Sequence, residues 1–296
     1  MLWSLEIYSV AIITPAKQFD IMLERAILSV QNNSSDDLNI THIIIFDNHY
    51  PKNVKLRCRD NYEMVIAYNT GIRGPAATRN IGLSYVNELY DYFGFLDADD
   101  YLTDDYILKS VNVISSDYCR VAFGQGISVD LNEQIISFSN VPIKNGSVAD
   151  RLIFANIIGC PSGLMLMNSL DNRTVRFDED LRLLEDYFYY LRLFNIGNSF
   201  YKTDARYFYQ IHEGQTTHSA WSESLQEQFI ILATKIKLID SRGIFQLLVK
   251  LRVNMSFYRL SHKSKVSGIL SGLFLGILCP EWTLGRVKMV LKNWLK

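Results

Sequence analysis

The 296-residue chain is 48% hydrophobic and holds 17 Tyr and 16 Phe, a composition that supports a packed core and excludes a disordered chain. The cysteines at 58, 119, 160 and 279 have no spacing for a zinc site or a disulfide framework, which favours a reducing, cytosolic setting. The net charge of −1 is unevenly distributed, because residues 231–296 carry twelve Lys or Arg against two acids, which leaves a charge of −11 on residues 1–230. This asymmetry indicates that the basic end faces a polyanion, either nucleic acid or an anionic membrane.

Apolar runs and helical patterns alternate over the first two-thirds of the chain. No basic leader opens it, so no signal peptide is expected. The predicted helices are Met22–Val30 and Ala76–Leu89, and the predicted strands are Tyr8–Thr14, His42–Phe46, Met64–Tyr68 and Phe93–Leu96, with Phe123–Val129 and Gln134–Phe138 as an antiparallel addition. This alternation indicates an α/β fold with a mostly parallel central sheet flanked by helices.

Three acids, Asp97, Asp99 and Asp100, follow the strand predicted at Phe93–Leu96. Open α/β sheets bind ligands at the carboxyl ends of their strands. Two carboxylates one residue apart can share a hard divalent cation of the Mg²⁺ or Mn²⁺ type, which takes oxygen ligands together with substrate phosphates. An Asp-rich turn that caps the helix after it is the alternative, because Asp is favoured in turns and at helix starts.

The C-terminal region, 221–296, has a strongly helical pattern. Val266–Leu278 lacks charge, but it is shorter than the ~20 residues that a spanning helix needs. The last segment, 282–296, separates apolar side chains from basic ones, as in helices that lie in membrane interfaces. The region is therefore predicted to be helical, basic and membrane-associating. A bundle packed on the main domain is the alternative, and nucleic acid is disfavoured because no binding motif accompanies the charge.

A series of short motifs follows in order along residues 8–218. These are Ile12–Ala16, Leu23–Val30, Ile43–Asn48, Arg73–Leu83, Phe95–Asp100, Phe177–Leu181, Leu184–Tyr187, Leu191–Leu193 and Tyr207–His212. In combination they resemble the family 2 glycosyltransferases, inverting enzymes of the GT-A fold that serve bacterial polysaccharide, O-antigen and capsule synthesis. The resemblance implies a GT-A, nucleotide-diphospho-sugar transferase domain at 1–220, followed by the helical region at 221–296.

The resemblance also implies Mn²⁺ or Mg²⁺ as a cofactor. It makes Asp99 the main metal ligand, Asp97 a contact to the ribose side of the nucleotide, and His212 the residue that completes the metal or pyrophosphate site. Negative charge grows on the diphosphate as the sugar departs, and a bound divalent cation neutralises it. Neutral imidazole is compatible with such an ion beside carboxylates. A hydrogen-bonded surface histidine is the alternative for His212.

The nucleotide-sugar site implied by the resemblance comprises Thr14, Pro15, Ala16, Asp47, Arg79, Asp97, Ala98 and Asp99. The first three would line the base pocket through backbone groups, and Asp47 would receive hydrogen bonds from the base or ribose. Arg79 is expected to pair with phosphate or to hold Asp97 in place, since guanidinium suits both tasks; a helix-surface ion pair is the alternative. Lys17 and Gln18 replace the family's usual Tyr-Asn, so a base other than uracil stays open.

Acceptor activation requires a base on the side of the sugar opposite the diphosphate. Asp186 matches the family's base, and the aromatic stretch Tyr187–Phe194 is expected to desolvate it and to raise its pKa. Glu185 is expected to orient the acceptor or a loop. The alternative has both acids as residues that favour a helix N-terminus.

The sequence therefore predicts a metal-dependent inverting glycosyltransferase. It would move a hexose or N-acetylhexosamine from a UDP-sugar to a glycan acceptor on a polyprenyl diphosphate lipid, in O-antigen or capsule synthesis, as a peripheral enzyme on the cytoplasmic face of an anionic membrane. A nucleotidyltransferase is one alternative, although Thr14–Gln18 lacks the glycine expected in a triphosphate-binding loop. A non-catalytic carbohydrate-binding or scaffold protein is the other, and it would keep its function after Asp99→Asn and Asp186→Asn.

Overall fold

The computed structural model describes residues 7–47, 60–116, 119–138, 152, 156–213, 215, 228, 231–232 and 234–235. The chain divides into two compact units, Met1–Trp221 and Ser222–Lys296. Most of the predicted C-terminal region, including the basic segment 282–296, lies outside the described residues. Within the part that the structure describes, none of the helices has the length and apolar character needed to cross a membrane.

The first half of the central sheet is parallel. Its strands are β1 (Tyr8–Ala16), β2 (Leu38–Asp47), β3 (Tyr62–Asn69) and β4 (Tyr92–Phe95), arranged in the order β3-β2-β1-β4. The strands predicted from apolar runs all form here. Because helices cover both faces, the middle strands are continuously apolar rather than alternating, and residues 43–46 of β2 have no exposed surface.

The second half of the sheet is mixed. It contains β5 (Tyr101–Leu102), β6 (Val121–Val129), β7 (Ile135–Phe138), β8 (Leu164–Met167) and β9 (Phe200–Gln210). Strand β8 runs antiparallel to β4 and β6, β9 runs parallel to β6, and β5 and β7 pair antiparallel with β9 and β6. The predicted antiparallel addition is therefore present, but the mostly parallel arrangement holds only for the first half.

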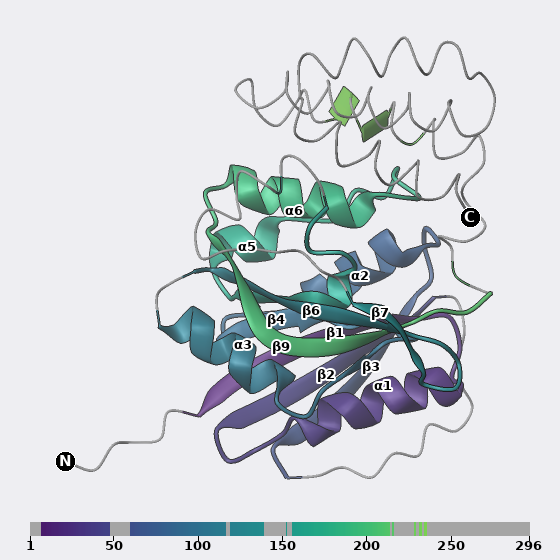
Figure 1. Ribbon diagram of the computed structural model, residues 1–296. Helices are drawn as coiled ribbons and strands as arrows, with labels where there is room; N and C mark the ends of the chain where they lie inside the picture. Colours follow the sequence, from purple (N-terminus) through teal and green to yellow (C-terminus); the bar gives the residue numbers. More distant parts are fainter. Residues whose placement is uncertain are drawn as a thin grey trace, which may run out of the picture. The chain divides into compact units, whose positions relative to one another are not determined.

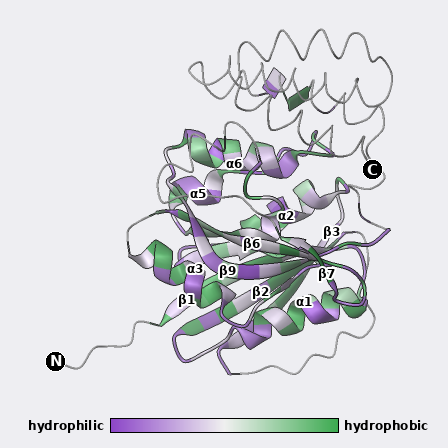
Figure 2. Cartoon of the chain, in the orientation of Figure 1, coloured by the Kyte–Doolittle hydropathy of each residue, from purple (hydrophilic) through white to green (hydrophobic). Residues whose placement is uncertain are grey.

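Two layers of helices enclose the sheet (Figure 1). The helices are α1 (Ile21–Asn32), α2 (Pro75–Ser84), α3 (Tyr106–Ser115), α5 (Leu170–Thr174) and α6 (Glu185–Asn195). One core cluster joins α1 and α3 to the face of β1 that carries Val10 and Ile12. On the other face, Gly82 of α2 lies against Ile13 and Tyr189 of α6 packs edge-on against Phe95. Hydrophobic residues accordingly gather along the strands (Figure 2).

Two helix ends show how local sequence sets the elements. Helix α1 begins after Asp20, whose carboxylate accepts hydrogen bonds from the N–H groups of Met22 and Leu23, as an N-cap does. Helix α2 ends at Ser84, earlier than the predicted Leu89, because Asn87 forms a side-chain turn by accepting the N–H of Leu89, a local alternative that competes with the helix.

Candidate active site

The end of β1 rests on a buried polar network. The Thr14 hydroxyl lies 2.8 Å from Nε2 of His42 on β2, and His42 Nδ1 lies 3.1 Å from the Tyr62 hydroxyl on β3. Burial lowers the pKa of His42 to about 3, so this ring is neutral. The Thr14 side chain is thus engaged inside the sheet, and the backbone of Thr14, Pro15 and Ala16 is what this strand end offers to a ligand.

Asp47, the last residue of β2, organises the loop between β3 and α2. Its Oδ1 accepts a hydrogen bond from Asn69 Nδ2 at 3.0 Å, and its Oδ2 accepts the N–H of Gly74 at 3.1 Å. Gly74 has φ +128°, a conformation open to glycine, and Pro75 then starts α2. Asp47 lies at the carboxyl edge of the sheet as expected, and its contact with a nucleotide stays a prediction.

Arg79 is buried in α2 and joins two acids from distant parts of the chain. Its Nη2 lies 2.5 Å from Asp97 Oδ1, and its Nη1 lies 3.2 Å from Glu185 Oε1. Its guanidinium also lies 5.3 Å from the centre of the Phe177 ring. Burial alone would lower the pKa of Arg79, but the charges of Asp97 and Glu185 raise it. The structure shows the expected pairing of Arg79 with Asp97, and a contact of Arg79 with phosphate stays a prediction.

Asp99 and His212, predicted to share a metal site, are in contact. His212 Nε2 lies 2.9 Å from Asp99 Oδ2, and both side chains are partly exposed. Burial and the nearby charge of Asp97 raise the pKa of Asp99, and the His212 contact opposes that rise. Ala98, between the two acids, is half-buried and packs against the core. A carboxylate beside an imidazole at an accessible edge fits a divalent cation of the Mn²⁺ type.

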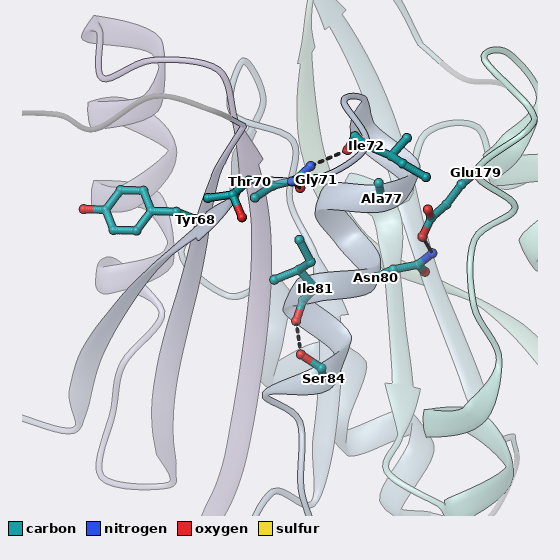
Figure 3. A pocket seen from close by; sticks show the side chains of 10 residues that line it. Tyr68, Thr70, Gly71, Ile72, Ala77, Asn80, Ile81, Ser84 and Glu179 are labelled. Atoms are coloured by element: carbon teal, nitrogen blue, oxygen red, sulfur yellow. Dashed lines mark hydrogen bonds between the residues drawn. The ribbon is translucent and has the colours of Figure 1, made fainter.

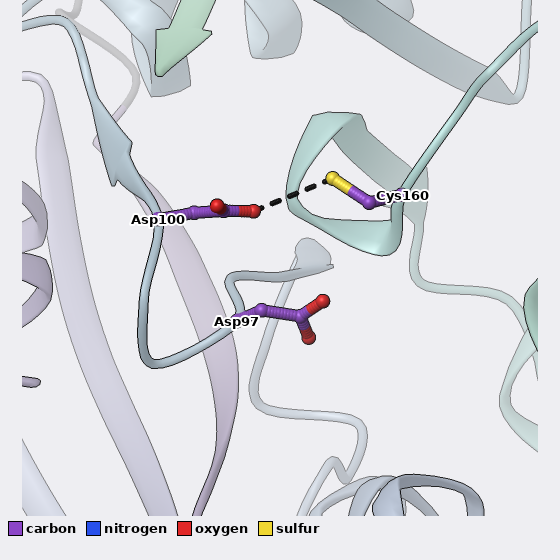
Figure 4. A group of neighbouring side chains, drawn as sticks. All are labelled: Asp97, Asp100 and Cys160. Atoms are coloured by element: carbon purple, nitrogen blue, oxygen red, sulfur yellow. Dashed lines mark hydrogen bonds between the residues drawn. The ribbon is translucent and has the colours of Figure 1, made fainter. Parts of the chain in front are cut away.

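Asp100, in contrast, faces the interior. Its Oδ2 accepts hydrogen bonds from Ser162 Oγ at 2.5 Å and Cys160 Sγ at 3.4 Å, and its Oδ1 accepts the N–H of Gln210 at 3.2 Å. Asp97, Asp100 and Cys160 offer ligand atoms within 4.8 Å of one another (Figure 4). Burial raises the pKa of both Asp100 and Cys160 well above the usual range. A protonated thiol suits no metal, so Asp99 with His212 is the better candidate.

Glu185 and Asp186 form the first turn of α6 (Glu185–Asn195). Leu184, just before it, has a left-handed backbone, with φ 66° and ψ 12°, and such strained positions concentrate at functional sites. Asp186 Oδ1 accepts the N–H of Tyr187 at 2.6 Å, and Oδ2 accepts from Asn156 Nδ2 at 3.3 Å. Burial, followed by the charge of Glu185, raises the pKa of Asp186 to about 7, the range of a working general base.

One connected set joins six of the predicted residues: Arg79, Asp97, Asp99, Glu185, Asp186 and His212. Thr14 and Asp47 instead contact His42 and Asn69. Arg79 links Asp97 to Glu185, Asp186 is the next residue after Glu185, and Asp99 follows Asp97 by two positions. The set combines a carboxylate poised to accept a proton with an accessible pair of ligands for a cation. Residues that sequence reasoning missed include Asn69, Asn156 and Ser162, whose Oγ accepts the N–H of Asp97 at 2.9 Å.

A separate hollow of about 410 Å³ lies between the end of β3 and α2. Its lining includes Ile72, Asn80, Ser84 and Glu179, as Figure 3 shows, together with Asn69. Asn80 donates a 2.8 Å hydrogen bond to Glu179. None of the predicted site residues lines it. The hollow therefore meets the candidate site at Asn69, which donates a hydrogen bond to Asp47.

A match to a known family assigns the class of protein to which the chain belongs. Residues 11–173, more than half of the chain, match the family described as Glycosyl transferase family 2. The chain therefore belongs to that family and is a glycosyltransferase.

Similar proteins agree with this assignment. An uncharacterized glycosyltransferase of Haemophilus influenzae (strain ATCC 51907 / DSM 11121 / KW20 / Rd) is 32% identical over 125 residues, which cover 41% of this chain and 48% of that protein. The chain thus matches about half the length of this relative.

Solved structures of S. aureus TarS share the fold. TarS 1-349 in complex with UDP-GlcNAc superposes with a TM-score of 0.64 and 16% identity over 86% of this chain and 73% of that one. The complex with UDP gives 0.63 and 16%, over 86% and 75%. The predicted GT-A fold is confirmed by this likeness.

Proposed function

We propose that the enzyme transfers a hexose or N-acetylhexosamine from a UDP-sugar, with inversion, to a glycan acceptor carried on a polyprenyl diphosphate lipid, in O-antigen or capsule synthesis. One observation carries this proposal: buried Arg79 joins Asp97, which follows β4, to Glu185 at the start of α6, the residue next to Asp186. The TarS complexes with UDP-GlcNAc and UDP support the choice of donor.

Asp186 is the proposed general base. It sits half-buried at the first turn of α6, and its pKa of about 7 lets it exist as a carboxylate at neutral pH and still accept a proton. The hydrogen bond from Asn156 orients one oxygen, and the N–H of Tyr187 fixes the other. Glu185, neutralised in part by Arg79, holds the start of the helix in place and raises the proton affinity of its neighbour.

The donor diphosphate would lie beside Asp99 and His212. When bound there, a Mn²⁺ or Mg²⁺ ion would neutralise the charge that develops on the leaving group. Asp97, fixed by Arg79, would face the ribose, and Asp47 with the backbone of Thr14–Ala16 would contact the base. This division puts charge stabilisation on the strand-end side of the sugar and proton removal on the α6 side.

We also propose that the basic C-terminal region keeps the enzyme on the cytoplasmic leaflet. The proposal rests on the twelve Lys or Arg within residues 231–296, each worth about 1 kcal/mol near an anionic surface. Vesicle flotation of the full chain and of a variant that lacks 263–296 tests it. Equal recovery of both proteins with anionic vesicles would reject this role.

A donor screen tests the central proposal. Thermal unfolding would be measured with UDP, GDP and CMP, each with and without Mn²⁺, because a ligand that binds the native state raises its stability. We expect a Mn²⁺-dependent shift with UDP, which Asp99→Asn abolishes and Asp186→Asn retains. Asp204→Asn, at an acid whose side chain is 84% exposed on β9, is the matched control. Sugar transfer that survives both Asp99→Asn and Asp186→Asn would exclude the mechanism.

A further inference from the structure

Asp100 is a buried acid that the proposed mechanism does not use. It comes directly after Asp99, but it has no exposed surface, whereas the side chain of Asp99 is 33% exposed. Figure 4 shows the Asp100 carboxylate directed toward Cys160. A buried polar group is costly unless it is hydrogen-bonded, so the partners of Asp100 indicate the role of its side chain.

One oxygen of Asp100 takes the place of a strand partner for β9. Strand β5, which follows Asp100, pairs with β9 over only two residues. Beyond that pairing, the N–H of Gln210 donates to Asp100 Oδ1 at 3.2 Å. Gln210 is 2% exposed and ends β9, and His212 follows two positions later. The Asp100 side chain therefore ties the end of β9 to the segment that carries Asp99.

The other oxygen of Asp100 reaches back to Asp97. Ser162 Oγ donates to Asp100 Oδ2 at 2.5 Å, and the same hydroxyl oxygen accepts the N–H of Asp97 at 2.9 Å. Ser162 has no exposed surface. The N–H of Asp100 also donates to the carbonyl oxygen of Asp97 at 3.1 Å. The turn from Asp97 to Asp100 is thus closed twice, by a backbone hydrogen bond and by a buried bridge through Ser162.

The contact between Asp99 and His212 depends on how their two segments are joined. The two side chains lie 2.9 Å apart, although the residues are 113 positions apart in the chain. On the other side of β9, the N–H of Ile211 donates to Val129 of β6 at 2.8 Å. That bond holds His212 relative to β6, whereas the bond from Gln210 to Asp100 joins its segment to the turn that carries Asp99.

We infer that Asp100 is a positioning residue that fixes the backbone from which Asp99 and His212 meet. This inference rests on the proposed function and deepens it, because it assigns the spacing of the candidate cation site to a buried side chain beside it. Groups that orient the ligands of a metal ion typically change its affinity by about 10–100-fold when they are replaced. Two alternatives are that Asp100 is itself a ligand, together with Asp97 and Cys160, and that it only stabilises the fold.

The test compares two substitutions of Asp100 in the full chain. Asp100→Asn keeps an oxygen for the N–H of Gln210 and brings an N–H group to Ser162 Oγ, which has a second lone pair. Asp100→Ala removes both connections. Ser162→Ala, which removes only the bridge to Asp97, is measured in the same way, so that the test stands if Asp100→Ala does not fold.

Asn172→Ala is the matched control. Asn172 also has no exposed surface, and its side chain is hydrogen-bonded to Met167 and Asn198. Asn198 precedes the start of β9 and so lies at the opposite end of that strand from Gln210. The control therefore removes a buried polar group of the same kind away from the candidate site. Thermal unfolding of every variant measures how much stability each substitution costs.

Two readouts separate positioning from stability. Hydrogen exchange of the metal-free proteins reports the protection of the Gln210 N–H, and Mn²⁺ titration followed by electron paramagnetic resonance, with UDP present, gives the dissociation constant of the ion. We expect Asp100→Ala to exchange the Gln210 N–H faster and to raise the Mn²⁺ dissociation constant by about 10–100-fold. Ser162→Ala should raise this constant by a smaller factor, and Asp100→Asn and Asn172→Ala should stay close to the wild type.

Equal Mn²⁺ affinity of the wild type and the folded Asp100→Ala or Ser162→Ala variant would overturn the inference, even where hydrogen exchange is faster. So would an equal loss of affinity in Asp100→Asn and Asp100→Ala, because Asp100 would then be a ligand. A loss of the same size in Asn172→Ala would reduce the effect to stability and would also overturn it. A wild type that binds no Mn²⁺ would exclude the cation site of the proposed function and the inference with it, so the two failures are distinguishable.

Discussion

Replacing Arg79 with Met tests whether its ion pairs hold the two halves of the site together. The Arg79 side chain is only 4% exposed, and its partners Asp97 and Glu185 are 22% and 13% exposed. Removing one partner of a buried ion pair leaves the other charges buried without compensation, which lowers the free energy of unfolding by about 3–5 kcal/mol. For a unit of this size, that loss lowers the melting temperature by about 6–20 °C.

Denaturant and thermal unfolding measure the effect, and Lys109→Met is the matched control. Lys109 also pairs with two acids, at 2.8 and 3.5 Å, but its side chain is 39% exposed, so its loss should cost below about 1 kcal/mol. Adding Glu185→Gln to Arg79→Met removes one stranded charge and should recover part of the loss, a coupling that a double-mutant cycle detects.

The pH dependence of the Arg79→Met defect gives an independent check. Burial raises the pKa of Glu185, and Arg79 opposes that rise. Without Arg79 the pKa rises further, so the folded variant takes up a proton more readily than the unfolded chain. The deficit should be largest at neutral pH and should shrink as the pH falls towards 4.5, the ordinary value for Glu185. A cost no larger than that of Lys109→Met at pH 7 would refute the reasoning.

Four further outcomes follow from the site and the sheet. In pH–rate profiles, kcat/KM for sugar transfer should rise with pH through about 7, because Asp186 must lose its proton to act as a base. Asp186→Asn should lower the rate by about 10²–10⁴-fold and remove this rising limb of the profile. Glu185→Gln should move the limb to lower pH, since the charge of Glu185 raises the pKa of Asp186, and an unmoved limb would contradict this coupling. Chelation by EDTA should abolish transfer and added Mn²⁺ should restore it, whereas Asp99→Asn should resist rescue; transfer undiminished in excess EDTA would contradict the metal role. In unfolding experiments, Gly124→Ala should cost about 1–3 kcal/mol, because its Cβ would lie 2.6 Å from the Tyr106 ring and 2.8 Å from the Ala205 carbonyl oxygen. A neutral result would contradict this close packing.

The parallel half of the sheet could be predicted from the sequence, because strands covered on both faces are long apolar runs. Strands β5 and β8 could not. They have two and four residues, and both are defined by partners distant in the chain: β5 pairs with β9, and β8 pairs with β4 and β6. The mixed pairing of the second half of the sheet depends on these long-range contacts, so no local sequence pattern predicts it.

The candidate site shows the same limit. Asp97, Asp99 and Asp100 look alike in the sequence, and the structure separates them: one pairs with Arg79, one contacts His212, and one is buried. The burial of Asp100 depends on Ser162 and Gln210, which lie 62 and 110 residues away in the chain. The family resemblance identified the positions of these three acids, whereas the direction of each carboxylate depends on tertiary contacts.

The neutral His42 ring inside the sheet makes the stability of the fold depend on pH. His42 stays uncharged down to about pH 3 when folded, while the unfolded chain takes up a proton near 6.5. Acidification below pH 6.5 therefore lowers the free energy of unfolding, and the contribution of His42 to this loss stops growing near pH 3. Mildly acidic surroundings would then weaken the part of the sheet in which this ring joins Thr14 of β1 to Tyr62 of β3.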